Sequence, residues 1–376
     1  MSLRLEEMGN QAQRGATSRA ERNAAQEIAA KFHGAADSVT IQPFRSLPGQ
    51  AQVYCACYII MALAAILLSY LPLLAMGLAI AGGMSFWLER KSLPVISRIL
   101  PKDKSQNVVA VKRRGERGRA RVILVAHYDT ARMPLVDNPP LEYWLPGLPM
   151  ALLMATVILG TMITVPGLSL PSWLGSVALL LLVPLLAGAF LMVYQENWGS
   201  PGYRDNAPGV EVMDYCFRQL TSQLPGGAEV WAVATGCRTA GNAGLLSFLE
   251  LYGGEIREDY LINIDLTRAG SLAYLTGEGH GKPLAADRDL VLAAAIHCRD
   301  NPLGFTAHGG KHFTTEAYPA LVRGYKAISV VSLDPQEDPE PEISPEDELN
   351  QGFAQAAAEL VISVARQIWA VKKIRA

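Results

Sequence analysis

The chain has 376 residues, half of them hydrophobic and only 18% charged, with a mean hydropathy of +0.17 and a formal net charge of -2. This composition is too apolar for an ordinary soluble domain and too charged for a bundle of membrane helices alone. It indicates a soluble domain of roughly 250 residues combined with a few membrane helices. The small negative charge gives no electrostatic basis for binding nucleic acid, so we expect no nucleic-acid partner.

The first polar region looks like the start of an α/β domain. Helical spacing of small and apolar residues predicts a helix over residues 19–35, and a strand is predicted over residues 38–44. The five cysteines of the chain show neither C-x-x-C spacing nor the pattern of a secreted disulfide scaffold. We therefore expect reduced thiols in a protein that faces the cytosol.

Two long apolar blocks follow. The first, Val53 to Trp87, holds no charge and contains Pro72, and its length fits two short membrane helices or, as an alternative, one long kinked helix. The second, Leu145 to Tyr194, is also free of charge and fits two helices of roughly 20 residues around the sequence TVPGLSLPS. Buried core helices are the less favoured alternative, because core helices rarely stay uncharged over such a length. We predict two transmembrane hairpins, over residues 53–88 and 144–195.

The charges beside these blocks predict an orientation. Six basic residues lie near the membrane ends of the polar segments, namely Arg45, Arg90, Lys91, Arg98, Lys102 and Lys104. The hairpin tips SYLPLL and TVPGLSLPS carry no Lys or Arg. The positive-inside rule then predicts an integral protein of the inner (cytoplasmic) membrane, embedded in the lipid bilayer, with its soluble domain facing the cytoplasm.

Glycines within the blocks would permit close helix contacts and oligomerisation through the membrane helices. They are Gly77, Gly82, Gly83, Gly175 and Gly188.

The polar remainder alternates strands with helices. Strands are predicted at 106–113, 121–129, 228–235, 259–267, 271–277 and 325–333, and helices at 209–220, 244–253, 287–300 and 349–373. This alternation predicts a mostly parallel sheet with helices on both faces. Residues 1–52, 89–143 and 196–376 would form one domain, which the hairpins at 53–88 and 144–195 interrupt.

Acids and a histidine stand where buried strands end or helices begin. The stretch VILVAHYDTAR leads a strand into His127 and Asp129, and alternation places both on one face. A carboxylate there can orient the imidazole or share in a metal site. Asp205 stands at a turn that opens a helix, and Asp265 ends another buried strand. Taken singly, each has an ordinary structural explanation, such as a helix cap for Asp205.

Taken together and in this order, the stretches resemble the co-catalytic zinc exopeptidases of metallopeptidase family twenty-eight, which includes bacterial leucyl aminopeptidases, glutamate carboxypeptidase and glutaminyl cyclase. The resemblance covers nearly the whole polar part and is carried by HYD after a strand, DN-x-x-G opening a helix, and a later N-x-D. It implies a three-layer α/β/α domain with a mixed, mostly parallel sheet. It also implies one metal held by His127, Asp205 and Asp265, with Asp129 orienting His127.

The family's second metal site is incomplete in this sequence. The Glu-Glu pair that supplies the general base and a ligand falls on Arg238 and Thr239, and the late His position falls on Ile343. The resemblance therefore implies one zinc ion at most, and not two. We expect the Arg238 guanidinium to pair with Asp205 or Asp265 instead. Loss of a positioned general base costs roughly 10²–10⁴ in rate.

Other residues could replace the missing groups. His308 and His312 precede the last predicted strand near the expected rim of the site, so either could act as a migrated ligand. Cys237 could act as a thiolate beside Arg238, whose charge would lower its pKa. Glu316 is the nearest acid in that stretch, but its spacing does not mark it as a base.

Two functions follow from these observations. The first is a polytopic membrane protein whose peptidase-like domain is a pseudoenzyme. It would bind a peptide, an amine or a partner protein in the cleft that holds the active site in the family. The alternative is an active single-metal aminopeptidase that hydrolyses peptides at the membrane, since zinc-bound water can reach a pKa of about 7 without a dedicated base. Transport is a third class, which the lack of charge within the apolar blocks argues against.

Overall fold

The computed structural model divides the chain into two compact units. Residues 1–48, 103–131 and 201–376 form one, which we call the α/β unit, and residues 49–102 and 132–200 form the other, the helical unit. The structure describes residues 14–115, 120–132, 139–165, 171–198, 201–203, 206–266, 271–300, 305–311, 313–333 and 346–375.

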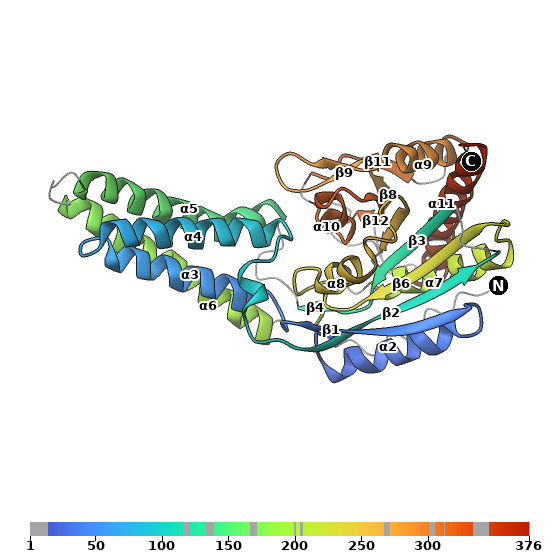
Figure 1. Cartoon of the computed structure of the whole chain (residues 1–376), viewed down its shortest axis with the longest axis horizontal. Coiled ribbons are helices and arrows are strands. Elements are labelled where there is room, and N and C mark those ends of the chain that lie inside the picture. Colours follow the sequence, from blue (N-terminus) through green and yellow to red (C-terminus); the bar gives the residue numbers. More distant parts are fainter. Residues whose placement is uncertain are drawn as a thin grey trace. The chain divides into compact units, whose positions relative to one another are not determined.

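An eight-stranded sheet forms the centre of the α/β unit (Figure 1). Its strands, in spatial order, are β1 (Ser38–Ser46), β2 (Asp103–Arg113), β6 (Ala228–Thr235), β3 (Ala120–His127), β7 (Tyr260–Asp265), β12 (Lys326–Leu333), β8 (Ser271–Leu275) and β11 (Phe305–His308). The central strands β6, β3, β7 and β12 are parallel, whereas β1, β2 and β8 pair antiparallel with their inner neighbours. The predicted mixed, mostly parallel α/β sheet is confirmed.

Helices cover both faces of this sheet. The helices are α2 (Arg19–Phe32), α7 (Ala207–Ser222), α9 (Arg288–Asp300) and α11 (Glu346–Arg375) on one face, and α8 (Ala243–Tyr252) and α10 (Ala317–Val322) on the other. Side chains of β3 alternate between the two resulting cores: Leu124 packs with the first group and Val125 with the second. Both faces of β3 and β6 are therefore buried, as is usual for parallel strands between helical layers.

Two short pairs complete the described strands. They are β4 (Ala131–Arg132) with β5 (Pro201–Tyr203), and β9 (Gly277–Glu278) with β10 (Leu284–Ala285), the latter antiparallel.

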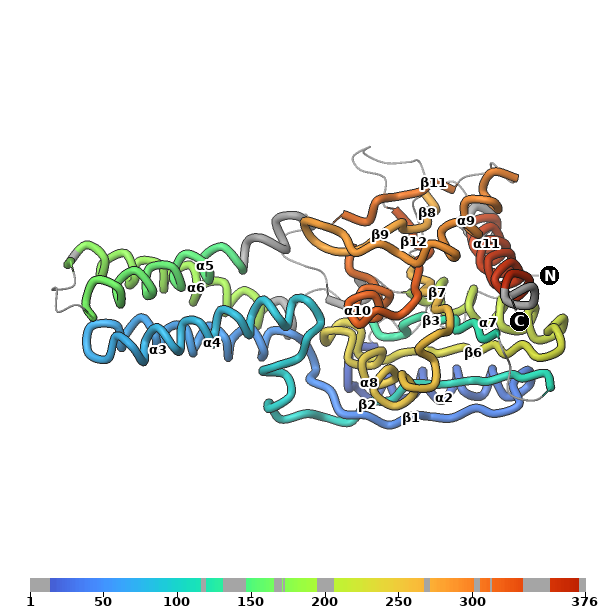
Figure 2. The backbone as a smooth tube through the Cα atoms, turned by 45° about the horizontal axis from the view of Figure 1, so that its top comes forward, coloured from blue at the N-terminus to red at the C-terminus, as the bar shows by residue number. Residues whose placement is uncertain are grey.

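Four long helices build the helical unit and pack side by side (Figure 2). They are α3 (Ala51–Leu67), α4 (Pro72–Arg90), α5 (Pro139–Thr164) and α6 (Ser172–Trp198), with a short 3₁₀ turn, η1 (Ile96–Arg98), after α4. The first apolar block thus forms two helices, with Pro72 at the first position of α4, where a proline needs no hydrogen-bond partner. The alternative of one kinked helix is wrong. Helices α5 and α6 have 26 and 27 residues, longer than predicted.

Three stretches of this unit are long and apolar enough to cross a membrane: Pro72–Arg90, Gly147–Thr164 and Trp173–Tyr194. Helix α3 is apolar too but has only 17 residues. The stretch of α6 buries just 11% of its residues within the structure. Large side chains such as Leu180 and Phe190 are 69% and 68% exposed.

Glycines allow close packing at some of the expected positions. A Cβ atom at Gly82 would touch Ile60, and one at Gly83 would lie 2.5 Å from the Met154 sulfur. A Cβ at Gly77 or Gly175 would meet no described atom within 4 Å. Close helix contacts therefore use the Gly82–Gly83 pair of α4.

Candidate functional site

The site lies where three neighbouring parallel strands end. His127 ends β3, Thr235 ends β6 and Asp265 ends β7, and β3 lies between the other two. His127 and Thr235 are register partners. Because parallel strands finish at one edge of a sheet, these side chains gather at the edge where open α/β sheets commonly bind ligands.

Asn206 fastens two of these strand ends together. Its Nδ2 donates to the main-chain oxygens of His127 at 3.2 Å and Ile264 at 2.9 Å, while its Oδ1 accepts from the Leu266 main-chain nitrogen at 2.8 Å. The DN motif therefore has a structural role in its Asn that sequence reasoning missed. Asp205, the predicted metal ligand beside it, lies outside the described residues.

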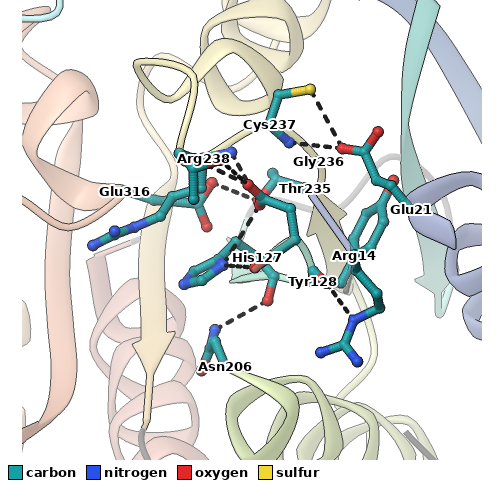
Figure 3. A network of polar contacts seen from close by, with 12 residues as sticks. Arg14, Glu21, His127, Tyr128, Asn206, Thr235, Gly236, Cys237, Arg238 and Glu316 are labelled. Carbon is teal, nitrogen blue, oxygen red and sulfur yellow. Dashed lines mark hydrogen bonds and ion pairs between the residues drawn. The ribbon is translucent and has the colours of Figure 1, made fainter. Parts of the chain in front are cut away.

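The turn after β3 is held from the N-terminal segment. Arg14 Nε donates to the main-chain oxygen of Tyr128 at 2.8 Å, and the Thr130 nitrogen donates to the main-chain oxygen of Arg14 at 3.0 Å (Figure 3). The Tyr128 hydroxyl donates to the Gln106 main-chain oxygen at 2.6 Å. The HYD turn is thus fixed from two sides.

Asp129 holds the turn that contains Arg238 and Thr239, the two residues at the positions of the family's Glu-Glu pair. Its Oδ1 accepts from the Arg238 main-chain nitrogen at 3.0 Å, and its Oδ2 accepts from Thr239, from the main-chain nitrogen at 3.0 Å and from the hydroxyl at 2.9 Å. Toward His127 Nδ1, the main-chain oxygen of Asp129 lies at 3.0 Å and its Oδ1 at 3.6 Å. Asp129 is fully buried, so among the described residues these partners stabilise its charge in place of solvent.

Arg238 contacts the acid that a metal would otherwise use. Its Nη2 lies 3.2 Å from Asp265 Oδ2, which confirms the expected ion pair. The other oxygen, Asp265 Oδ1, lies 3.6 Å from His127 Nε2. A guanidinium and an imidazole therefore share one carboxylate at the end of β7.

The charges of this cluster balance one another. Burial lowers the pKa of His127, but the carboxylates of Asp129 and Asp265, each with an oxygen 3.6 Å from a ring nitrogen, outweigh it and raise the pKa to about 10. Burial also opposes ionisation of Asp129, but His127 and the Thr239 and Arg238 main-chain groups hold its pKa below the ordinary value. Two cations, His127 and Arg238, thus face two carboxylates, Asp129 and Asp265.

Glu316 is a third described acid of the site, and sequence reasoning set it aside. It precedes α10, is fully buried, and accepts a hydrogen bond on Oε1 from the Thr235 hydroxyl (Figure 3). Its Oε2 has no partner among the described residues. Burial raises the pKa of Glu316 to about 7, against the lowering effects of His127, Thr235 and Arg238. A buried acid poised near neutrality is typical of functional sites.

We expect Glu316→Gln to change the pH dependence of stability. The carboxyl of Glu316 titrates near its ordinary pKa in the unfolded chain and near 7 in the folded chain. Its contribution to the free energy of unfolding is therefore fully present below about pH 4.5 and is lost as the pH rises to about 7. The variant stays neutral, and its stability relative to the wild type should rise by up to about 3 kcal/mol between pH 4 and pH 8.

Thermal unfolding of the full chain in detergent across this pH range measures the difference. Glu258→Gln serves as the control, because the Glu258 side chain is 81% exposed. A difference between Glu316→Gln and wild type that does not change with pH would contradict the assignment.

Cys237 is held by a second buried acid, Glu21 of α2. Glu21 Oε1 accepts from the main-chain nitrogen of Cys237 at 3.0 Å and from its thiol at 3.3 Å, and Oε2 accepts from the Ser105 hydroxyl at 3.0 Å. Burial, together with the charges of Glu21 and Asp129, raises the pKa of Cys237 well above its ordinary value. The pKa of Cys237 is thus raised and not lowered, so the thiolate alternative is wrong.

Alkylation of the folded chain with iodoacetamide at pH 8 should leave Cys237 unmodified. Because its thiol is fully buried and its pKa is raised, its rate in the folded chain should lie far below its rate in the denatured chain. Peptide mass spectrometry of native and denatured protein measures this, with the partly buried Cys298 as internal comparison. Modification of Cys237 at the rate of the denatured chain would show that the Glu21 contact does not hold.

His308 lies away from this cluster. It sits on the edge strand β11, and β7, β12 and β8 separate that strand from β3. Its Nδ1 accepts from the Gly310 main-chain nitrogen at 3.0 Å. His308 is therefore not the migrated ligand, whereas His312 lies outside the described residues.

The described residues alone do not make a zinc site. His127 Nε2 is buried and has no hydrogen-bond partner within the described part of the chain, and Asp265 Oδ1 lies 3.6 Å from it. Yet a catalytic zinc takes three protein ligands, and among the described residues no three His, Cys, Asp or Glu side chains gather into a metal-binding group. The Arg238 guanidinium also occupies Asp265 Oδ2.

Comparisons with known proteins identify the fold. No protein-family model and no curated protein sequence matches the chain. The zinc aminopeptidase BSAP from Bacillus subtilis is 15% identical, over 96% of this chain and 91% of that one, with a TM-score of 0.51. The glutaminyl cyclase of an Acidobacteriales bacterium is 11% identical, over 97% of this chain and 92% of that one, with a TM-score of 0.50. The chain thus has the α/β fold of zinc exopeptidases.

Proposed function

We propose that this chain is an integral membrane protein whose peptidase-like unit faces the cytoplasm and binds a ligand without performing the two-metal peptidase reaction. The observation that carries the proposal is the ion pair between Arg238 and Asp265. A guanidinium there supplies the positive charge that a metal ion would bring, so the carboxylates of the site are already neutralised.

The neighbouring residues support this view. Arg238 and Thr239 carry no carboxylate that could deprotonate a water, and both donate main-chain hydrogen bonds to Asp129. In the zinc exopeptidase family that the sequence resembles, these two positions hold the general base and a metal ligand. A ligand held in such a cleft would be a peptide, an amine or a segment of a partner protein.

Membrane insertion is supported by the surface of the helical unit. Three stretches of the described residues have the length and apolarity of spanning helices, and many of their large side chains, such as Leu74, Leu159 and Leu180, are exposed. A soluble protein rarely exposes so continuous an apolar surface. The basic residues of the polar segments, with none at the hairpin tips, favour a cytoplasmic α/β unit.

Elemental analysis and an aminoacyl-substrate screen test the proposal together. We expect the full chain, purified in detergent and supplied with zinc, to show no aminopeptidase turnover and no stoichiometric zinc. An active zinc aminopeptidase in the same detergent is the positive control. Turnover that His127→Ala abolishes would overturn the proposal, because contamination would not respond to that change.

A single-metal hydrolase is the second candidate, and one observation favours it: the buried His127 Nε2 has no hydrogen-bond partner among the described residues. In that case His127, Asp205 and Asp265 would hold one zinc ion, which would activate water for peptide hydrolysis. Near-stoichiometric zinc that is lost in Asp265→Ala would support this candidate. A metal-free wild type would exclude it.

A further inference from the structure

A groove of about 160 Å³ lies on the helical unit between α4 and α5. Its lining consists of Gly83, Met84, Trp87, Leu88, Lys91 and Met154. Gly83 brings no side chain to the groove, and Met84 is 55% exposed beside it. The lining is thus apolar along the helix and carries one ammonium group at the end of α4.

The end of α4 is strongly basic. Residues 89–102 contain one acid, Glu89, against four basic residues, Arg90, Lys91, Arg98 and Lys102. Glu89 Oε1 already accepts hydrogen bonds from the main-chain nitrogens of Val95 at 2.6 Å and Ser97 at 2.8 Å.

Lys91 is the one cation of this segment that lines the groove. Arg90 lies over the ring of Phe86, 5.4 Å from its centroid, and is occupied by that contact. No ion pair joins Lys91 to an acid in the part of the chain that the structure describes. A groove with apolar walls and an exposed cation at its end suits a molecule that has an apolar chain and an anionic head.

We propose that this groove binds an anionic phospholipid, with the phosphate on Lys91 and one acyl chain along Met84, Trp87 and Met154. The inference rests on the proposed membrane insertion. Trp87 fits this arrangement, because tryptophan favours the headgroup level of a bilayer. A zwitterionic lipid would place its own cation beside Lys91, and a free phosphate would gain nothing from the apolar walls.

Native mass spectrometry of the full chain, released from nanodiscs of equal phosphatidylglycerol and phosphatidylcholine, tests the proposal. The wild type should retain phosphatidylglycerol in preference to phosphatidylcholine. Lys91→Gln should reduce the retained phosphatidylglycerol about fivefold, which is the expected effect of one cation near an anionic surface. Arg98→Gln, which removes an equal charge from the same segment but outside the groove lining, should retain it like the wild type.

A second variant separates the groove from the charge. Met84→Trp keeps every charge and fills the groove, so it should lose retention as Lys91→Gln does. Equal losses in the Lys91 and Arg98 variants would show diffuse attraction and overturn the proposal, as would unchanged retention in Lys91→Gln. A chain that enters no nanodisc of either lipid would overturn membrane insertion itself, and this inference with it.

Discussion

Replacing Asp129 by asparagine is expected to destabilise the α/β unit by about 3 kcal/mol and to free the turn that carries Arg238 and Thr239. Both carboxylate oxygens accept main-chain N–H groups of that turn. An amide offers only one accepting oxygen, so its NH₂ group would face an N–H donor at a fully buried position. Hydrogen bonds to a buried charge are worth about 1.5–3 kcal/mol each, and one of them is lost outright.

Denaturation of the full chain in detergent measures the effect of this change. Asp37→Asn is the matched control, because the Asp37 side chain is 47% exposed and its ion pair with Lys112 should contribute about 1 kcal/mol or less. The folded-state pKa of Asp129 is lowered, so the wild-type advantage should be present above the ordinary carboxyl pKa and disappear as the pH falls below it. Equal stability of wild type and Asp129→Asn at pH 7 would refute this role.

Gly244→Ala should be at least as damaging, with a loss of about 3 kcal/mol or more. Gly244 is the second residue of α8, and a Cβ atom there would clash with the main-chain oxygen of Gly236 and lie 2.6 Å from Asn107 Oδ1. The Asn107 side chain bridges the two glycines, donating to the Gly244 oxygen at 2.9 Å and accepting from the Gly236 nitrogen at 3.2 Å. Backbone atoms cannot rotate away, so the turn that holds Cys237 must open.

The control for Gly244 lies just beyond the same helix. A Cβ at Gly254 meets nothing within 4 Å, so Gly254→Ala should leave the unfolding temperature almost unchanged. The expected pair of results is a large drop in the unfolding temperature for Gly244→Ala and none for Gly254→Ala. Similar values for both would mean that the close approach of Gly236 and Gly244 is not required.

The long elements could be predicted because their patterns are local. Strand β6 was predicted over residues 228–235 and spans Ala228–Thr235, since a continuous apolar run suits a strand that is buried on both faces. The edge strand β11 and the six-residue helix α10 were missed. Four and six residues carry too little periodicity to be distinguished from a loop.

The site was predictable only in part. The positions of His127 and Asp265 followed from apolar strands that end in polar residues. The contact of Arg238 with Asp265 was one of two expected pairings, with Asp205 as the other, and followed from the family resemblance together with charge. Glu21 was not predictable, because its contact with Cys237 joins residues 216 positions apart. Its sequence signal was that of a helix start: the Ser18 hydroxyl accepts from the Glu21 nitrogen at 3.0 Å, and the carboxylate turns into the core instead.

The burial of Glu316 in the site was also not predictable from the sequence. Its only sequence signal is a single acid in the stretch HFTTEAYPALV, immediately before apolar residues. Burial of Glu316 beside Thr235 arises because α10 packs over the ends of the parallel strands, and a topology of this kind cannot be read from spacing.

The register of β1 and β2 has a consequence for how the chain is made. Ser46 and Asp103 are partners in this pair, although α3 and α4 lie between them in the sequence. Closing so long a loop has an entropy cost that grows with its length, and the cost falls once α3 and α4 have folded back on each other. During biosynthesis the helices α3 and α4 should therefore assemble before β1 and β2 pair at the edge of the sheet.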